Sequence, residues 1–412
     1  MLSVSIKDRD ILRVLAYHQM ELADSPVNKT RINEWYEHND YNGKRPMIHF
    51  ELGSFQDEVL QKRLKCTDKD ARNIEAELYR NFINFEVFDD DKPVRNYFPV
   101  QWNTWFLPFN LEVKKKHAPN GGVGHLFEDQ IGDLSRSLPM LKKSSFGLDR
   151  AATLRRIEIT QELFGDILPV RIEGLSVSCY LTYYILKLMG METMLFSICD
   201  YPDEFKEMMR RLTDDLLEYY RFCEKEALFL PTTGFEHVGQ GSFAFNTTLK
   251  QEPPVKLSDI WLHMNSQESV VLSPEMFAEF VFPCYKKIAD HFGRLSYGCC
   301  EPVDGFWESS LSKFINLGKI TISPWCDQEF MGNELRGKNI IFHRKPSPNF
   351  IGVNRELDES GFRAHINETL HFAQGCHLEI TQRDVYTIHN DEAKVRRYVA
   401  IIRECIENNW KQ

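Results

Sequence analysis

Two adjacent cysteines followed by a glutamate form the part of this sequence with the clearest chemical potential. Cys299 ends a run, 294–299, whose residues are typical of a β-strand, and Cys300 and Glu301 follow it directly. Thiolates and carboxylates are ligands that zinc accepts, and a zinc ion with an open position can activate a substrate. Neighbouring strand residues point to opposite faces, so at most one cysteine is expected to face inward. A zinc site and two buried thiols packed at a tight turn both remain open.

Ionisable and aromatic side chains follow several other strand-like runs. Carboxylates there could exchange a proton with substrate, cations could hold a carboxylate or phenolate, and an aromatic ring could stack on a flat ligand. Each also has a structural alternative: a core histidine, a loop anchor, or, for Glu379, an ion pair with an arginine or lysine. The predicted catalytic residues are Asp327, Glu379 and Asp384, and the predicted substrate-binding residues are His237, Gln267, Tyr297, Trp325, Lys345 and Arg383.

Alternating strand-like and helix-like runs after residue 149 predict the elements that must position these side chains. Strands joined by crossover helices are typical of a parallel sheet, and eight such units predict a (β/α)8 TIM barrel whose active site lies at the carboxyl ends of the strands. An open doubly wound sheet is the alternative, but no glycine-rich nucleotide motif supports it. We therefore expect a mostly helical N-terminal extension and excursion over 1–150 and a barrel over 151–412. The predicted strands are 168–172, 194–198, 232–238, 260–264, 294–299, 319–323, 339–342 and 377–380.

Composition excludes several classes of function. The 412 residues include 50 Lys+Arg against 60 Asp+Glu, a net charge of −10, which argues against a protein that binds nucleic acid. No apolar run is long enough to cross a membrane, and the N-terminus does not read as a signal peptide, so a cytoplasmic location is expected. Most of the ten cysteines are then expected to be reduced and buried. The aromatic segment 102–109 packs the extension onto the barrel or supports a homodimer.

Residues 150–410 resemble the uroporphyrinogen decarboxylase-like superfamily, and most closely its branch of corrinoid-dependent methyltransferase-like proteins of anaerobes. The resemblance implies a TIM barrel, a zinc-assisted methyl transfer and a cobalamin carried by a separate corrinoid protein, since no D-x-H-x-x-G motif occurs here. The zinc enzymes of the superfamily carry H-x-C at this strand end, where this chain has Tyr297-Gly298-Cys299. The resemblance rests on Gln267-Glu268, Ser273-Pro274-Glu275-Met276-Phe277, Tyr297-Gly298-Cys299-Cys300-Glu301-Pro302, Ser323-Pro324-Trp325-Cys326-Asp327 and Lys345-Pro346-Ser347-Pro348.

The predicted function is therefore demethylation of a small methylated compound, such as an O-methyl aromatic. The methyl group would move between that compound and the corrinoid protein, with zinc held by Cys299, Cys300 and Glu301. Decarboxylation or lyase chemistry on a small or tetrapyrrole-like carboxylate is the alternative prediction. A member of the fold that binds a ligand without turning it over is the third.

Overall fold

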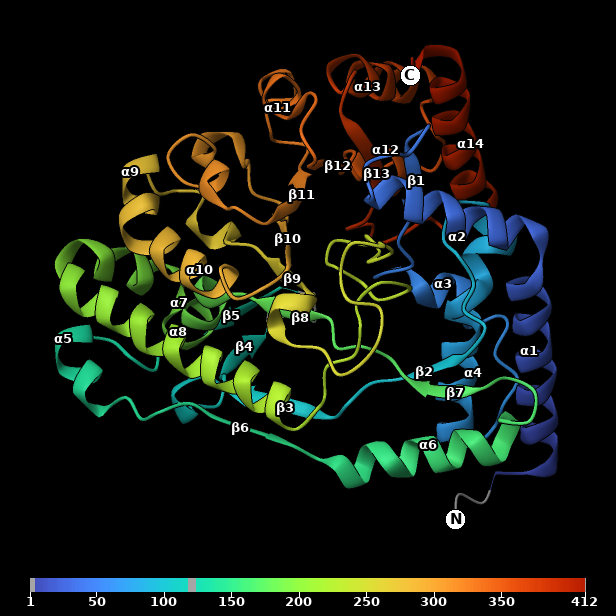
Figure 1. Ribbon diagram of the computed structural model, residues 1–412, viewed down its shortest axis with the longest axis horizontal. Coiled ribbons are helices and arrows are strands. Elements are labelled where there is room, and N and C mark those ends of the chain that lie inside the picture. Colours follow the sequence, from blue (N-terminus) through green and yellow to red (C-terminus); the bar gives the residue numbers. More distant parts are fainter. Residues whose placement is uncertain (1–3, 118–123, 412) are drawn as a thin grey trace.

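A parallel sheet of seven strands organises the computed structural model, which describes residues 4–117 and 124–411 (Figure 1). The strands lie in the order β1-β13-β12-β11-β10-β9-β8, and every neighbouring pair is parallel. Three two-stranded pairs, β2-β7, β3-β6 and β4-β5, lie outside this sheet. The strands are Met47–Phe50 (β1), Phe98–Val100 (β2), Thr104–Leu107 (β3), Lys115–His117 (β4), His125–Phe127 (β5), Ser145–Leu148 (β6), Val170–Ile172 (β7), Val177–Cys179 (β8), Trp261–Met264 (β9), Arg294–Tyr297 (β10), Leu317–Ile322 (β11), Ile341–Arg344 (β12) and His377–Gln382 (β13).

Helices connect the strands, and α9 begins with a side-chain cap. Ser273 accepts a hydrogen bond from the backbone of Met276, with Pro274 in the first helical position. No helix of the described residues has both the length and the apolar character needed to cross a membrane. The helices are Ile6–Asp24 (α1), Pro26–Asn39 (α2), Gln56–Leu60 (α3), Lys69–Ile83 (α4), Leu134–Ser137 (α5), Arg150–Phe164 (α6), Leu181–Asp200 (α7), Pro202–Lys225 (α8), Pro274–Met276 (α9), Phe282–Ala289 (α10), Gln328–Leu335 (α11), Asn349–Gly352 (α12), Glu359–Phe372 (α13) and Glu392–Asn409 (α14).

The two faces of the sheet differ sharply in polarity because strand residues alternate between them. One face packs in the main hydrophobic core, and on β11 it presents Ile320 and Ile322. The alternate residues of the same strand, Lys319 and Thr321, are fully buried but polar. The interior of the curved sheet is therefore lined with polar side chains, which must find partners there.

The predicted barrel is correct in class and wrong in detail. Five predicted strands are confirmed as β9 to β13. The run 194–198 is wrong because it lies within α7, and 232–238 forms only an isolated bridge between His237 and Phe243. The run 168–172 contains β7, which pairs with β2 outside the main sheet. The sheet has seven strands rather than eight, and in the described part of the chain no pairing joins β8 to β1.

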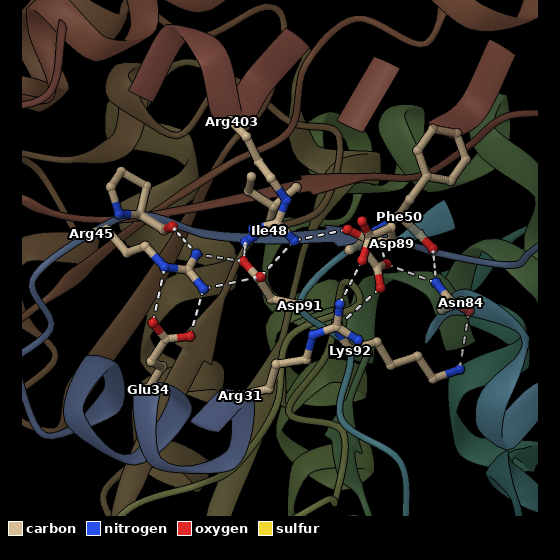
Figure 2. Close-up of polar contacts among 12 residues, drawn as sticks. Arg31, Glu34, Arg45, Ile48, Phe50, Asn84, Asp89, Asp91, Lys92 and Arg403 are labelled. Carbon is tan, nitrogen blue, oxygen red and sulfur yellow. Dashed lines mark hydrogen bonds and ion pairs between the residues drawn. The ribbon is translucent and has the colours of Figure 1, made fainter. Parts of the chain in front are cut away.

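The open edge of β1 is capped by carboxylates rather than by another strand (Figure 2). Asp91 accepts a hydrogen bond from the backbone N–H of Ile48 at 2.8 Å, and Asp90 accepts one from Phe50 at 2.8 Å. Arg45 and Arg403 in turn donate to Asp91. These bonds satisfy donors that an edge strand would otherwise expose. Because β1 belongs to the sheet, the predicted boundary at residue 150 does not mark where the sheet begins.

Residues 232–246, between α8 and β9, pass through the concave interior of the sheet (Figure 1). Lys319 of β11 donates to Ser242 Oγ at 2.5 Å and to the Phe243 carbonyl at 3.2 Å. His49 of β1 contacts the Gly241 carbonyl through Nδ1 at 2.6 Å. This segment therefore fills the polar interior and contacts strands on both sides of it.

Candidate active site

Cys299 and Cys300 lie in the turn after β10, at the carboxyl end of the sheet. Their sulfur atoms are 3.6 Å apart, and both residues are half-buried. Lys345, directly after β12, places Nζ 3.4 Å from Cys300 Sγ and 3.2 Å from the Cys299 carbonyl oxygen. The side chain of Lys345 is only 3% exposed. The structure thus brings the two thiols and a buried ammonium group together at the carboxyl end of the sheet. We call this group of side chains, with those that contact it, the mouth.

Two carboxylates and an arginine complete the charged part of this mouth. Asp384, after β13, accepts from Lys345 Nζ at 2.8 Å, and its Oδ2 lies 3.7 Å from Cys300 Sγ. Arg383 pairs with Glu51, just after β1, at 2.9 Å, and lies 3.7 Å from Asp384. The carboxyl ends of β1, β10, β12 and β13 therefore supply one connected set of charges.

The Gly239-Gln240-Gly241 stretch carries a polar side chain into the same mouth. All three residues have left-handed backbones, with φ of 94°, 52° and 81°. A Cβ atom at Gly239 would overlap the ring of His263, so only glycine fits there. Gln240 Oε1 accepts from Lys345 at 3.3 Å, and Gln240 Nε2 lies 3.4 Å from His263 Nε2. Gln240 is the non-glycine residue of the three, and its left-handed backbone is strained. Backbone strain at a non-glycine residue is typical of functional sites.

The electrostatics of the mouth favour an ionised Cys300. The hydrogen bond from Cys299 and the charge of Lys345 lower the pKa of Cys300 to about 7, despite burial. The pKa of Cys299 is raised, because its thiol hydrogen bonds to Cys300 and is itself buried. Burial raises the pKa of Asp384, but Lys345 outweighs that effect and keeps it below its usual range. At neutral pH about half of the molecules therefore carry a thiolate beside an ion pair, which is an activated nucleophile.

Glu379 lies deeper in the interior, away from the thiols. It is fully buried and pairs with Lys319 at 3.0 Å, His38 at 3.3 Å and His343 at 3.5 Å. Burial raises the pKa of Glu379, but Lys319 and the two histidines hold it well below its ordinary value. The predicted alternative of an ion pair thus describes this residue, with Lys319 as the partner.

Five other predicted residues are not part of this arrangement. Asp327 caps α11 by accepting from the Phe330 backbone, and Trp325 beside it is 73% exposed. Gln267 is exposed in a short turn after β9. Tyr297 is buried in the apolar core, and His237 packs on the ring of Phe243. Within residues 4–117 and 124–411, none of these five side chains forms a hydrogen bond or ion pair with the thiols, Lys345 or Asp384.

The predicted zinc ligands do not fit a zinc site in this arrangement. Glu301 is 1% exposed, and its two oxygens accept from the backbone N–H groups of Ser266 at 3.0 Å and Cys299 at 2.9 Å. Across residues 4–117 and 124–411, no three His, Cys, Asp or Glu side chains form a group that could hold a metal ion. Asp384 lies 3.7 Å from Cys300 Sγ, but its carboxylate is paired with Lys345.

Four residues at the mouth were not predicted from the sequence: Glu51, Tyr180, Gln240 and His263. Glu51 follows β1, which was assigned to the extension, and Tyr180 follows β8, a strand of only three residues. The ring of Tyr180 lies 5.8 Å from that of His263. The two glycines around Gln240 were the only signal in the sequence that could have found any of them.

No protein-family model matches the chain, and no curated protein matches it. Among solved structures, the chain is similar to a methyltransferase from Methanosarcina mazei, with 11% sequence identity and a TM-score of 0.48. The alignment covers 91% of this chain and 98% of that one.

Proposed function

We propose that the chain is a methyltransferase in which Cys300 takes a methyl group from a small methylated compound. A separate corrinoid protein is the partner that exchanges this methyl group. The observation that carries the proposal is the position of Lys345 Nζ, 3.4 Å from Cys300 Sγ, in a mouth that lowers the pKa of this thiol to about 7. A thiolate is a soft nucleophile that reacts readily at a methyl carbon.

The residues of the mouth have distinct roles in this reaction. Cys300 sulfur forms a bond to the methyl carbon as the bond from that carbon to the donor atom breaks, and the donor atom keeps the bonding electron pair. Lys345 stabilises the thiolate before attack, and Asp384 and Gln240 hold Lys345 in place. Cys299 donates its S–H to the thiolate. The corrinoid carrier would supply a nucleophilic cobalt centre, which takes the methyl group and regenerates the thiolate.

Decarboxylation of a small or tetrapyrrole-like carboxylate was the alternative prediction. It would need cations free to hold the carboxylate and the developing carbanion. Lys345 and Arg383 are instead paired with Asp384 and Glu51. We therefore keep methyl transfer as the single proposed function.

Mass spectrometry of the Cys300 peptide after incubation with methyl donors tests the proposal. We expect Cys300 to gain one methyl group in the wild-type protein and in Cys199→Ser, which removes an exposed thiol elsewhere on the chain. Cys300→Ser should not be methylated at this peptide. Pre-treatment with a chelator should leave the reaction unchanged, since the mouth does not assemble a zinc site. Failure of every donor to methylate Cys300 would overturn the proposal.

The corrinoid step has its own test. Methylated protein incubated with reduced cobalamin should lose the methyl group from Cys300, and the cobalamin absorbance should change to that of the methylated form. Retention of the methyl group under these conditions would overturn the proposed transfer from Cys300 to the corrinoid protein. It would not affect the proposed methylation of Cys300.

A further inference from the structure

The turn after β10 places the two thiols of the mouth against each other. In an extended strand the side chains of adjacent residues point to opposite faces. Here β10 ends at Tyr297, and Gly298 turns the chain with a φ of 105°. The sulfur atoms of Cys299 and Cys300 consequently lie 3.6 Å apart. A disulfide bond is about 2.0 Å long, so the two sulfurs have only about 1.6 Å left to close.

Backbone hydrogen bonds fix this turn. Gly298 donates its N–H to the Met264 carbonyl at 2.8 Å, and Cys299 donates its N–H to the buried Glu301 carboxylate at 2.9 Å. Glu301 also accepts from the backbone of Ser266, so it ties the turn to the loop after β9. The fold therefore holds the two sulfurs together in advance, and little further ordering is needed for them to react with each other.

The cation beside the thiols does not depend on them for its partners. Lys345 Nζ carries three N–H groups and has three oxygen acceptors within reach: Asp384 at 2.8 Å, Gln240 Oε1 at 3.3 Å and the Cys299 carbonyl at 3.2 Å. Loss of the Cys300 thiol as an acceptor thus leaves no N–H of this buried ammonium group without a partner. The mouth is therefore able to hold two neutral, bonded sulfurs in place of two thiols.

Exposure and proximity together distinguish this pair among the cysteines. Six of the ten are buried, whereas Cys299 and Cys300 are half-buried, so a small reagent can reach them. Oxidation of a thiol depends on such access, and a second thiol nearby diverts it to a disulfide. Cys199 is exposed and provides a comparison for oxidation at an accessible thiol elsewhere on the chain.

We propose that Cys299 and Cys300 form a reversible disulfide when the protein meets a hydroperoxide, and that this bond switches off methyl transfer at Cys300. The second part rests on the proposed function, whereas the first does not. Cys300 sulfur attacks one peroxide oxygen, an S–O bond forms as the O–O bond breaks, and one water leaves with the thiol proton. Cys299 sulfur then forms the S–S bond as the S–O bond breaks, and a second water leaves with its proton. The two thiols lose two electrons and two protons, and hydrogen peroxide is reduced to two molecules of water.

The closeness of the two residues in the chain makes the bond reversible. Adjacent Cα atoms are about 3.8 Å apart, which is shorter than the spacing of about 4.4 to 6.8 Å usual for disulfides. Strained disulfides are the readily reduced ones, so a small dithiol should restore both thiols.

Mass spectrometry of the full-length protein tests the disulfide without any methyl donor. The protein is treated with hydrogen peroxide and unfolded, and its free thiols are alkylated with iodoacetamide. The tryptic peptide 295–313 contains Cys299 and Cys300 and no other cysteine. We expect this peptide to lose two hydrogen atoms and to take up no alkyl group, and dithiothreitol should restore two alkylation sites. Cys199→Ser is the matched control and should behave as wild type.

A variant without the second thiol sharpens this test. In Cys299→Ser, excess peroxide should add oxygen atoms to Cys300 that dithiothreitol does not remove, because no neighbouring thiol intercepts the oxidation. A wild-type peptide that keeps both thiols, or that gains oxygen without losing the two hydrogen atoms, would overturn the inference.

The consequence for methyl transfer is measured separately. Methylation of Cys300 in the wild-type protein should be lost after peroxide and should return after dithiothreitol, whereas in Cys299→Ser it should not return. Methylation that stays absent after both wild-type thiols have been restored would overturn the switch. Absence of methylation before any oxidation would overturn the proposed function, and the disulfide measured on the peptide would be unaffected.

Discussion

Replacing Lys345 by methionine should raise the pKa of the Cys300 thiol by about two units. Two unit charges at the observed separation of 3.4 Å interact by about 1 kcal/mol in water and about 5 kcal/mol in a protein interior of intermediate polarity. These limits correspond to roughly one to four pKa units, and the half-buried position of Cys300 argues for a value between them. The thiol pKa should then move from about 7 to about 9. At neutral pH the thiolate fraction would fall from about half to about 1%.

The assay is the rate of Cys300 alkylation by iodoacetamide as a function of pH, followed on the Cys300 peptide. Lys345→Met should shift the profile to higher pH and should reach the wild-type rate once the thiol is ionised. Asp384→Asn should shift the profile the other way, since it removes an anion 3.7 Å from the sulfur. Lys345→Arg keeps the charge and should retain most of the lowered pKa. A profile for Lys345→Met that coincides with wild type would refute the role assigned to Lys345.

Three further predictions concern the segments that support the mouth. Lys319→Met leaves the buried Glu379 carboxylate without its cation, so the free energy of unfolding should fall by about 3 to 5 kcal/mol in a urea titration; a loss typical of a surface pair would contradict this. Gly239→Ala should lower the melting temperature and slow Cys300 methylation, because φ is 94° and a Cβ has no room, whereas Gly305→Ala, which meets nothing within 4 Å, should be near neutral. Burial and a nearby carboxylate raise the pKa of Glu236 from 4.5 to about 7, so its stabilising contribution is present below pH 4.5 and is lost as pH rises through about 7. Glu236→Gln should therefore match wild type at about pH 4 and exceed its stability by up to about 3 kcal/mol at about pH 8, as measured by thermal unfolding; equal curves at both pH values would contradict the assignment.

The sequence by itself determined the class of fold and the chemistry available at the mouth. The strands β9 to β13 were readable because each is an apolar or alternating run followed by a polar loop, a local pattern that does not depend on distant residues. The carboxyl ends of parallel strands meet at one edge, so Cys300, Lys345, Arg383 and Asp384 could be expected there together. The structure brings these residues into contact.

Only the tertiary structure decided which side chains pair and which strands join the sheet. The strand β8 has only three residues, too few for a periodic signal, and β1 lies outside the alternating pattern that begins after residue 149. The apolar run 194–198 fits a buried helix as well as a strand. The partners of Glu379 and Lys345 come from residues between 36 and 341 positions away in the chain. Glu301 was a plausible metal ligand by residue type, but two backbone N–H groups occupy its oxygens. Local patterning determines which face of a strand is polar, whereas the partner that neutralises a buried charge depends on distances that only the folded chain establishes.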